Sequence, residues 1–346
     1  MKLPTTMRAL QLQGINQLAE VQAPLPHLQA GEVLVRTVST TICTSDLNDI
    51  AHNPFGITLP RVMGHEGAGV VAARGEHVRE FQVGDRVAAH PVIPCRACDN
   101  CRRGLGHLCS NMGHLGLDRD GTFAEYFCIR ADRVRRVPDR VSFNAASLLE
   151  PVAVSLEAVE RGRIGQGNSV LVVGDGPFGI IIARLAARAN PRRIILVGRH
   201  DFRLDQVPEA VRIHEKRALD ARQAVLEANE GEGLDVAIMA AGTQSALDLC
   251  TASLRARGRV VVFSAVQGTA SLNLFRLHTQ ELEILGACND LELMDAALER
   301  LSDPQLRLGS LVTHRLPFEQ WPRAFELARG GKDETLKVAL QFENPA

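Results

Sequence analysis

Four cysteines, Cys95, Cys98, Cys101 and Cys109, carry the most specific chemistry in the sequence, in the arrangement Cys-x2-Cys-x2-Cys-x7-Cys. Four thiolates form a tetrahedral shell that suits Zn²⁺ and leaves no open coordination position. Such a site stabilises a loop and takes no direct part in catalysis. An iron–sulfur cluster is the rival, but ferredoxin spacing would continue with Cys-x3-Cys-Pro, which is missing here. Four unliganded thiols are the simplest alternative, and the tight spacing favours a structural zinc.

A glycine-rich turn of the form G-x-G-x-x-G follows the apolar segment 169–173 and opens the helical pattern 177–189. Its candidate dinucleotide-binding residues are Gly174, Gly176, Pro177, Phe178 and Gly179. The first glycine permits a tight bend, the second lets the backbone approach a pyrophosphate, and the third allows close helix–strand contact. The first N–H groups of the helix attract phosphate. A ligand-free glycine turn is the alternative, but the strand before it and the helix after it favour a nucleotide site.

The segment after the second apolar run, 193–197, favours NADP over NAD. An acid at the end of this strand would bind the ribose 2′-hydroxyl of NAD, yet the chain has Gly198 and Arg199 there. Gly198 leaves room, and the guanidinium of Arg199 can pair with a 2′-phosphate, with help from Arg203. Two alternatives stay open: Arg199 is an exposed charge without a ligand, or Asp201 takes the acid's role. NAD therefore remains possible.

Periodicity divides the chain of 346 residues into parts of different character. Short strands broken by Gly and Pro dominate the first 150 residues, and they predict an antiparallel, partly barrel-like unit. Strands then alternate with helices, which is typical of a parallel sheet. The predicted strands are 32–42, 67–73, 86–89, 122–129, 169–173, 193–197, 234–240, 259–263, 311–314 and 335–341, and the predicted helices are 153–161, 177–189, 245–255, 291–301 and 318–328.

Charge and composition exclude several classes of protein. The net charge is −1 and 45% of the residues are hydrophobic, so no electrostatic case exists for binding nucleic acid or an anionic membrane. The small basic cluster at 130–136 is interpreted as the wet face of a strand. No apolar run reaches the ~20 residues that a membrane span needs. We expect a cytoplasmic protein with no nucleic-acid or membrane partner.

Three scattered segments could supply a second metal site: 43–46, 64–66 and 150–151. Taken singly, Cys43 could be a core residue, His65 a satisfied polar group and Glu150 a surface charge. Together with the segments 67–71, 83–87, 121–126, 149–151, 174–179 and 240–243, however, the chain resembles the zinc-containing medium-chain dehydrogenase/reductase family along nearly its whole length. The sorbitol, threonine and galactitol-phosphate dehydrogenase branch is the most similar.

The resemblance implies an α/β fold with a mostly β, GroES-like catalytic domain and a Rossmann domain with a doubly wound parallel sheet. It places the catalytic domain at 1–151 and 287–346 and the Rossmann domain at 152–286. It also implies two zinc ions per chain and a homodimer or homotetramer, with 259–263 and the segment near 272–274 as candidate edge-pairing segments.

For the catalytic zinc the resemblance implies Cys43 and His65 as ligands, with Glu66 or Glu150 as the third. Asp46 would orient His65 through its other ring nitrogen. Ser45 would contact the substrate oxygen and begin the proton relay; a helix N-cap is its structural alternative. Many relatives continue this relay with a histidine, but this chain has Asn48 there, which cannot take up a proton.

The implied reaction is hydride transfer between an alcohol or polyol and NADP(H), with zinc lowering the pKa of the hydroxyl. A threonine-type dehydrogenase of amino alcohols is one alternative. A non-catalytic nucleotide-binding relative is a second, and a zinc-finger regulator is a weaker third because a basic surface is missing.

Overall fold

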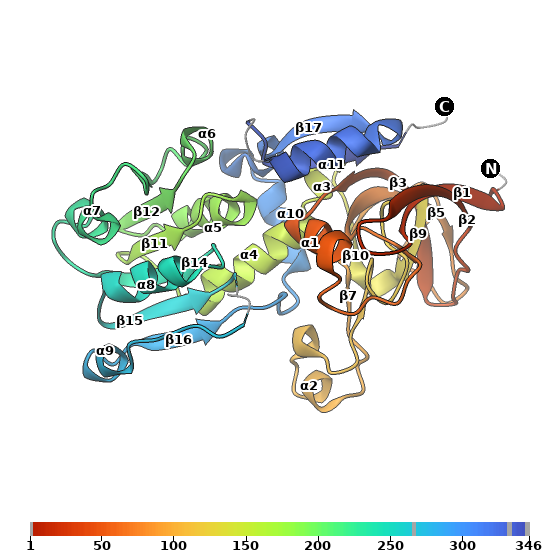
Figure 1. Cartoon of the computed structure of the whole chain (residues 1–346). Helices are drawn as coiled ribbons and strands as arrows, with labels where there is room; N and C mark the ends of the chain where they lie inside the picture. The colour runs from red at the N-terminus through yellow and green to blue at the C-terminus, as the bar shows by residue number, and fades with distance from the viewer. Residues whose placement is uncertain (1–2, 265–267, 331–333, 343–346) are drawn as a thin grey trace. The chain divides into compact units, whose positions relative to one another are not determined.

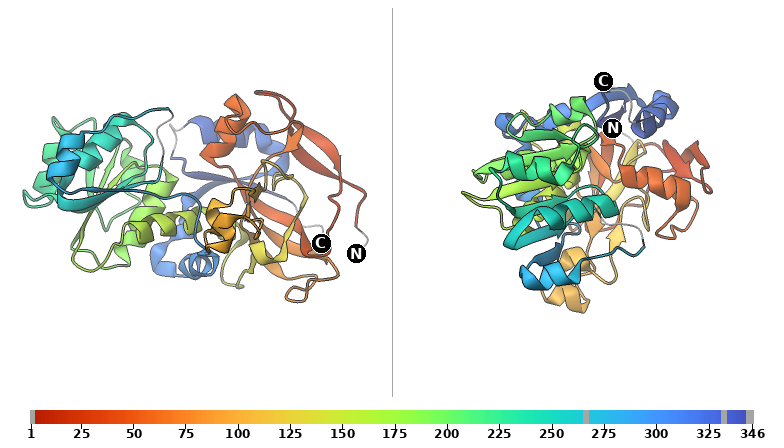
Figure 2. Two further views of the ribbon diagram at one scale, coloured as in Figure 1. Left: turned by 90° about the horizontal axis from the view of Figure 1, so that it is seen from below. Right: turned by 60° about the vertical axis from the view of Figure 1, so that its left-hand side comes forward.

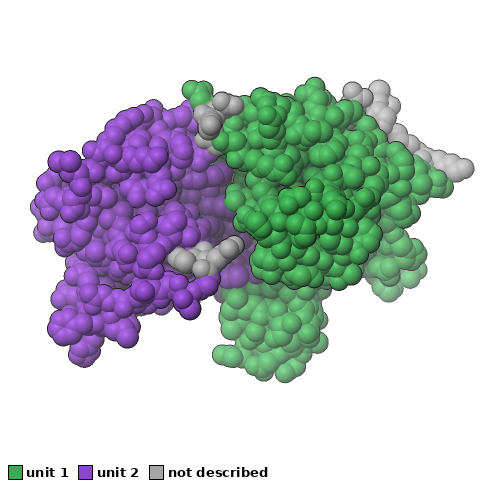
Figure 3. Space-filling model, in the orientation of Figure 1, with its two compact units in different colours: residues 1–150, 294–346 green, residues 151–293 purple. Residues whose placement is uncertain are grey.

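The computed structural model describes residues 3–264, 268–330 and 334–342, and the chain divides into two compact units. Unit 1 comprises residues 1–150 and 294–346, and unit 2 comprises residues 151–293 (Figure 3). The closing segment of the chain thus belongs to the same unit as the first 150 residues.

Unit 1 is built on antiparallel strands, and its largest sheet has seven strands within the described residues. Parallel pairing occurs where β17 meets β18, and β18 pairs with the centrally placed β3. The strands run in the order β10 (Val134–Arg136), β6 (Arg86–Ala89), β5 (Glu66–Arg74), β3 (Glu32–Thr41), β18 (Lys337–Gln341) and β17 (Val312–Pro317), with β9 (Tyr126–Arg130) also on β3. The smaller sheets are β2 (Leu18–Pro24), β1 (Thr6–Leu12), β4 (Arg61–Val62), and β7 (Val92–Ile93) with β8 (Gly113–His114).

Short helices complete unit 1 (Figure 1). They are α1 (Thr44–His52), α2 (Asp99–Arg102), α3 (Phe143–Ala146), α10 (Met294–Leu301) and α11 (Trp321–Gly330), with 3-10 turns at Gly106–Leu108, Ala131–Arg133, Pro304–Leu306, Leu308–Leu311 and Phe318–Gln320. Phe123 and Phe325 meet edge to face in the core at 5.6 Å, beside Ile50 of α1. This packing fixes the helix that carries Ser45 and Asp46.

Unit 2 contains a six-stranded parallel sheet among its described residues, in the order β13 (Val211–His214), β12 (Arg193–Gly198), β11 (Ser169–Val173), β14 (Leu234–Met239), β15 (Leu254–Val262) and β16 (Glu283–Gly286). This is the strand order of the Rossmann dinucleotide-binding fold. Successive strands are added on one side of β11 as far as β13, and then on its other side from β14 onwards. The helices are α4 (Leu149–Arg161), whose first two residues belong to unit 1, α5 (Pro177–Ala187), α6 (Asp201–Leu204), α7 (Ala221–Ala228), α8 (Gln244–Ser253) and α9 (Leu274–Thr279). Figure 2 shows the same sheet from two further directions.

Two predicted strands differ from the structure for identifiable reasons. The strand expected at 122–129 begins only at Tyr126, because the N–H groups of Thr122 and Phe123 donate to the carbonyls of Gly64 and Met63 in a loop. The segment 259–263 was expected to offer a free sheet edge, but β15 lies between β14 and β16. That expectation was wrong because β13 and β16, which form the edges, were not predicted.

The basic cluster at 130–136 was also interpreted wrongly in part. Arg133 is buried, and its Nη2 donates to Nδ1 of the buried His90 at 2.7 Å, whereas Arg136 is exposed. The cluster is therefore not a uniform wet face. Among the described residues no helix combines the length and the hydropathy needed to cross a bilayer.

Candidate active site

The four clustered cysteines meet around one point in a surface lobe. Sγ of Cys95 lies 4.0 Å from Sγ of Cys101, and Sγ of Cys98 lies 3.8 Å from Sγ of Cys109. A tetrahedral shell with Zn–S bonds of about 2.3 Å places its sulfurs about 3.8 Å apart. The spacing of these thiols thus fits a zinc ion with all four positions filled.

Backbone donors in the lobe favour the thiolate form of Cys95 and Cys98, whereas desolvation by burial raises the pKa of Cys101 to about 12. The N–H groups of Ala97 and Cys98 donate to Sγ of Cys95 at 3.4 and 3.3 Å and lower the pKa of that thiol. N–H groups of Cys101 and Ser110 lower the pKa of Cys98 to about 6. The lobe is therefore prepared for a cation by its backbone as well as by its thiols.

A second group of donors is buried in unit 1. One ligand atom each from Cys43, His65 and Glu66 lies within 4.8 Å of the other two. Cys43 directly precedes α1, His65 follows the turn at Gly64, and Glu66 opens β5. Gly64 has φ +93°, and a Cβ there would lie 2.6 Å from the ring of Phe123, so this bend requires glycine. One thiolate, one imidazole and one carboxylate are donors that Zn²⁺ accepts, and three donors leave a position for substrate.

Asp46 fixes the orientation of His65, as predicted. Nδ1 of His65 lies 3.0 Å from Oδ1 of Asp46, and Oδ2 of Asp46 accepts the backbone N–H of Cys43 at 2.8 Å. Nε2 therefore remains for a metal or the neighbouring Ser45, whose Oγ is 3.5 Å away. Burial opposes the imidazolium, but Asp46 and Cys43 hold the pKa of His65 above its usual range. The same negative surroundings favour a metal cation.

A buried lysine, which the sequence analysis missed, binds the carboxylate of Glu66. Lys337 on β18 donates through Nζ to Oε1 of Glu66, and the hydroxyl of Thr41 donates to Oε2. The side chains of Lys337 and Glu66 are 2% and 0% exposed. Burial lowers the pKa of Lys337, but Cys43, Glu66 and Glu150 outweigh this and raise it. The lysine therefore stays charged and compensates the acids around it.

Glu150 does not join the three meeting donors. It stands at the start of α4, and its charge acts on Lys337, which places it in the same electrostatic environment. Asp49 is a further acid that the sequence analysis missed: it is 2% exposed on α1, and burial together with Asp46 raises its pKa to about 6. Asn48 is exposed.

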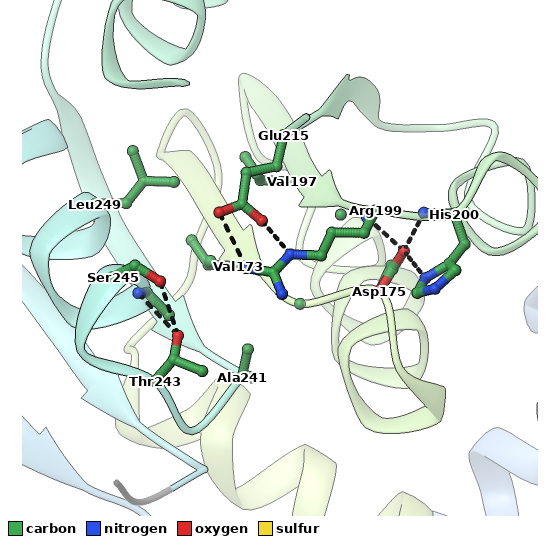
Figure 4. A pocket seen from close by; sticks show the side chains of 13 residues that line it. Val173, Asp175, Val197, Arg199, His200, Glu215, Ala241, Thr243, Ser245 and Leu249 are labelled. Carbon is green, nitrogen blue, oxygen red and sulfur yellow. Dashed lines mark hydrogen bonds and ion pairs between the residues drawn. The ribbon is translucent and has the colours of Figure 1, made fainter. Parts of the chain in front are cut away.

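Unit 2 has a cavity of about 210 Å³ at the carboxyl ends of β11 and β12 (Figure 4). Ligands of open α/β sheets bind at such strand ends, where the strand order reverses. The cavity is lined by Val173, Gly174, Asp175, Val197, Gly198, Arg199, His200, Glu215, Ala241, Thr243, Ser245, Ala246 and Leu249. Gly198 and Arg199 thus line the cavity, whereas Arg203 on α6 does not line it.

The glycine turn has the geometry that the fingerprint predicts. Gly174 has φ +125°, and a Cβ on Gly179 would lie 1.9 Å from the carbonyl oxygen of Gly174. A Cβ on Gly176 would meet no atom within 4 Å, so the backbone there is open to an approaching group. Pro177 and Phe178 begin α5, which presents its first N–H groups at this turn, and neither lines the cavity.

Two acids that line the cavity, Asp175 and Glu215, were not predicted from the sequence as site residues. Asp175 lies beside Gly198, where a Cβ would come within 2.4 Å of Cβ of Asp175. The room that Gly198 was expected to leave is therefore filled. Glu215, directly after β13, pairs with Arg199, with Oε2 at 2.6 Å from Nε. Asp201 does not line the cavity and pairs with Arg217.

Comparison with known proteins identifies the family of the chain. The family model "Alcohol dehydrogenase GroES-like domain" matches residues 29–139, and "Zinc-binding dehydrogenase" matches residues 177–303. Sorbitol dehydrogenase of Bacillus subtilis (strain 168) is 30% identical over 345 residues, covering 98% of each chain. The chain belongs to the zinc-containing medium-chain dehydrogenase/reductase family. It is an enzyme of the zinc-dependent, NAD(P)-linked alcohol and polyol dehydrogenase type, with a Cys/His/Glu zinc site, a four-cysteine zinc site and a nicotinamide cofactor.

Two further relatives indicate the range of this family. L-threonine 3-dehydrogenase of Pyrococcus abyssi (strain GE5 / Orsay) is 32% identical over 336 residues, covering 94% of this chain and 95% of its own. A crystal structure described as a short chain alcohol dehydrogenase from Escherichia coli CFT073, complexed with NADH, is 27% identical with a TM-score of 0.91, covering 98% of this chain and all of its own. Relatives that are named for different substrates thus match nearly the whole chain.

Proposed function

We propose that the chain transfers hydride between a secondary alcohol or polyol, or the corresponding ketone, and a nicotinamide cofactor, with NADP(H) preferred to NAD(H). The observation that carries the proposal is the buried group of Cys43, His65 and Glu66, whose ligand atoms lie within 4.8 Å of one another. When bound there, zinc lowers the pKa of the substrate hydroxyl, and the nicotinamide accepts the hydride.

Cys43, His65 and Glu66 are the proposed zinc donors in this reaction. Glu150 is the alternative third donor, because Lys337 and Thr41 already bind the two oxygens of Glu66. Asp46 keeps Nε2 of His65 directed at the metal by binding Nδ1. Lys337 keeps the carboxylate of Glu66 ionised and holds it beside the other donors.

Ser45 is the proposed contact for the substrate hydroxyl and the first acceptor of its proton. Its Oγ is 3.5 Å from Nε2 of His65, so it lies next to the atom that would bind the metal. Asn48 cannot relay the proton further, because an amide does not titrate in water.

The NADP preference rests on the end of β12. Gly198 and Arg199 stand where an acid would bind the ribose 2′-hydroxyl, and Arg199 lines the cavity beside the glycine turn. Gly174, Gly176 and Gly179 with the start of α5, Pro177 and Phe178, are the proposed pyrophosphate contacts. Arg203 is a proposed outer contact of the 2′-phosphate. NAD remains the second cofactor, since a relative of 27% identity is complexed with NADH.

Threonine-type dehydrogenation is the second candidate, because a relative that is 32% identical is an L-threonine 3-dehydrogenase. On the strength of the family resemblance we also propose a cytoplasmic homodimer or homotetramer. The edge strand β16 is the pairing segment proposed here, in place of 259–263.

The test is a panel of sorbitol, other polyols, secondary alcohols, ketones and L-threonine, assayed separately with NADP and NAD before and after zinc removal. The proposal expects turnover of a polyol or secondary alcohol that depends on zinc and is faster with NADP. Preferential turnover of L-threonine would select the second candidate, and full activity without zinc would exclude both. Arg199→Asp should then shift the preference from NADP towards NAD, and an unchanged preference would refute the role of Arg199.

A further inference from the structure

In the cofactor cavity of unit 2, the backbone N–H groups at the end of β12 already donate to a carboxylate, that of Asp175. Oδ2 of Asp175 accepts the backbone N–H groups of Arg199 and His200 at 2.7 and 2.8 Å, and lies 3.0 Å from Nδ1 of His200 (Figure 4). Asp175 is 7% exposed, and the absence of a side chain at Gly198 makes its position possible. The donors at the end of β12 are therefore already satisfied by a carboxylate of the glycine turn.

This leaves the guanidinium of Arg199 as the group inside the cavity that can recognise a 2′-phosphate. Among the described residues lining the cavity, Arg199 is the one with a permanent positive charge. His200 already directs Nδ1 at Asp175. Backbone amides often share the binding of phosphate, but here they are occupied. How freely Arg199 can bind the 2′-phosphate therefore determines how strongly the cavity distinguishes NADP from NAD.

Glu215 forms an ion pair with the guanidinium of Arg199. Nε and Nη2 of Arg199 donate to Oε2 and Oε1 of Glu215 at 2.6 and 3.3 Å. The backbone N–H of Glu215 donates to the carbonyl of Gly198 at 2.8 Å, which fixes the acid beside the strand end. Arg199 and Glu215 are 48% and 32% exposed, so the pair is solvated and weak enough for a phosphate to displace it.

We propose that Glu215 is a specificity-determining residue: it competes with the 2′-phosphate of NADP for Arg199 and thereby limits the preference for NADP over NAD. The inference rests on the proposed function, because it assumes that this cavity receives the adenosine end of the cofactor. A dinucleotide without the 2′-phosphate leaves the Arg199–Glu215 pair intact. One with it must break the pair and face a carboxylate of like charge.

The experiment compares two probes that differ only in the 2′-phosphate, adenosine 5′-monophosphate and adenosine 2′,5′-bisphosphate. Their dissociation constants are measured by calorimetry on the zinc-loaded full chain, and the ratio of the two is the readout, independent of turnover. The variant is Glu215→Gln. The matched control is Asp201→Asn, which removes the same charge from an exposed pair with Arg217 outside the cavity.

Glu215→Gln should strengthen binding of the bisphosphate relative to the monophosphate by about three- to tenfold, the range of a solvated ion pair plus a removed like charge. Asp201→Asn should leave the ratio unchanged. An unchanged ratio in Glu215→Gln, or an equal change in Asp201→Asn, would overturn the inference while leaving the cofactor site in place. If neither probe binds the unmodified chain, the cavity is not the adenosine site, and the cofactor part of the proposed function fails as well.

Discussion

The two groups of metal donors in unit 1 are held in different ways. The four cysteines of the lobe come from fifteen consecutive residues, and three of them are partly exposed to solvent. Cys43, His65 and Glu66 come from two distant segments and are buried, with a lysine 271 residues away bound to the glutamate. The lobe needs only local spacing and backbone donors. The buried group needs a tertiary structure that brings a compensating cation, because uncompensated buried charge is costly.

The largest effect is expected from removing a donor of the buried group. Cys43→Ser should lower kcat by at least about 10³-fold, because the zinc contribution to the reaction amounts to several kcal/mol. Zinc content should fall from two ions per chain to one, measured by atomic absorption, while circular dichroism stays unchanged.

The matched change in the lobe sharpens the comparison. Cys98→Ser should also remove one zinc, but kcat should stay within about tenfold, since a closed four-thiolate shell offers no position for substrate. Limited proteolysis should now cleave between Cys95 and Cys109. If both variants lost activity equally, the division into a catalytic and a structural site would be wrong.

The next largest effect should follow from removing the buried cation. Lys337→Met leaves the carboxylate of Glu66 buried without its partner, which should destabilise the chain by about 3–5 kcal/mol in chemical denaturation. Adding Glu66→Gln should recover part of that loss. The exposed Arg102, near the lobe cysteines, is the control: Arg102→Gln should change stability by less than about 0.5 kcal/mol. Equal effects would mean that Lys337 does not compensate charge.

Replacing Asp49 is expected to have a smaller effect on stability than replacing Lys337, and to stabilise the chain where the loss of Lys337 destabilises it. Burial raises its pKa from 3.8 to about 6, so the folded state disfavours the ionised form. The protonated form of Asp49 contributes to the free energy of unfolding. This contribution is fully present below pH ~4 and is lost as the pH rises through about 6. Asp49→Asn should therefore stabilise the chain at pH 8 by up to about 3 kcal/mol and have little effect at pH 4. Chemical denaturation at both pH values measures this, and equal effects at the two would show that ionisation is not the cause.

Local spacing let the sequence predict much of this molecule. The cysteine lobe, the glycine turn and the strands at 86–89 and 169–173 carry their signals within a few residues, and the structure has those elements. The buried donors Cys43 and His65 could be proposed only through the family resemblance, since nothing in their spacing brings them together. The assignment of roles to these residues, and of domains to 1–151, 152–286 and 287–346, stays a prediction.

The residues that were missed depend on tertiary register. Lys337 reaches Glu66 because β18 pairs with β3, which also pairs with β5. Glu215 meets Arg199 because Gly198 of β12 and His214 of β13 are register partners. The strand β13 has only four residues, two of which are exposed. Its weak alternation gave no strand signal. The sequence could have indicated Glu215 only to a reader who already knew that His214, the residue before it, pairs with Gly198.

The most direct test of the central claim is to follow the reduction of NADP by a polyol or secondary alcohol that the chain turns over, while the zinc is removed with a chelator and then restored. The account predicts that activity falls to near zero with the loss of one zinc per chain and returns when zinc is added, but not in Cys43→Ser. Undiminished activity in protein that holds no zinc would contradict the account.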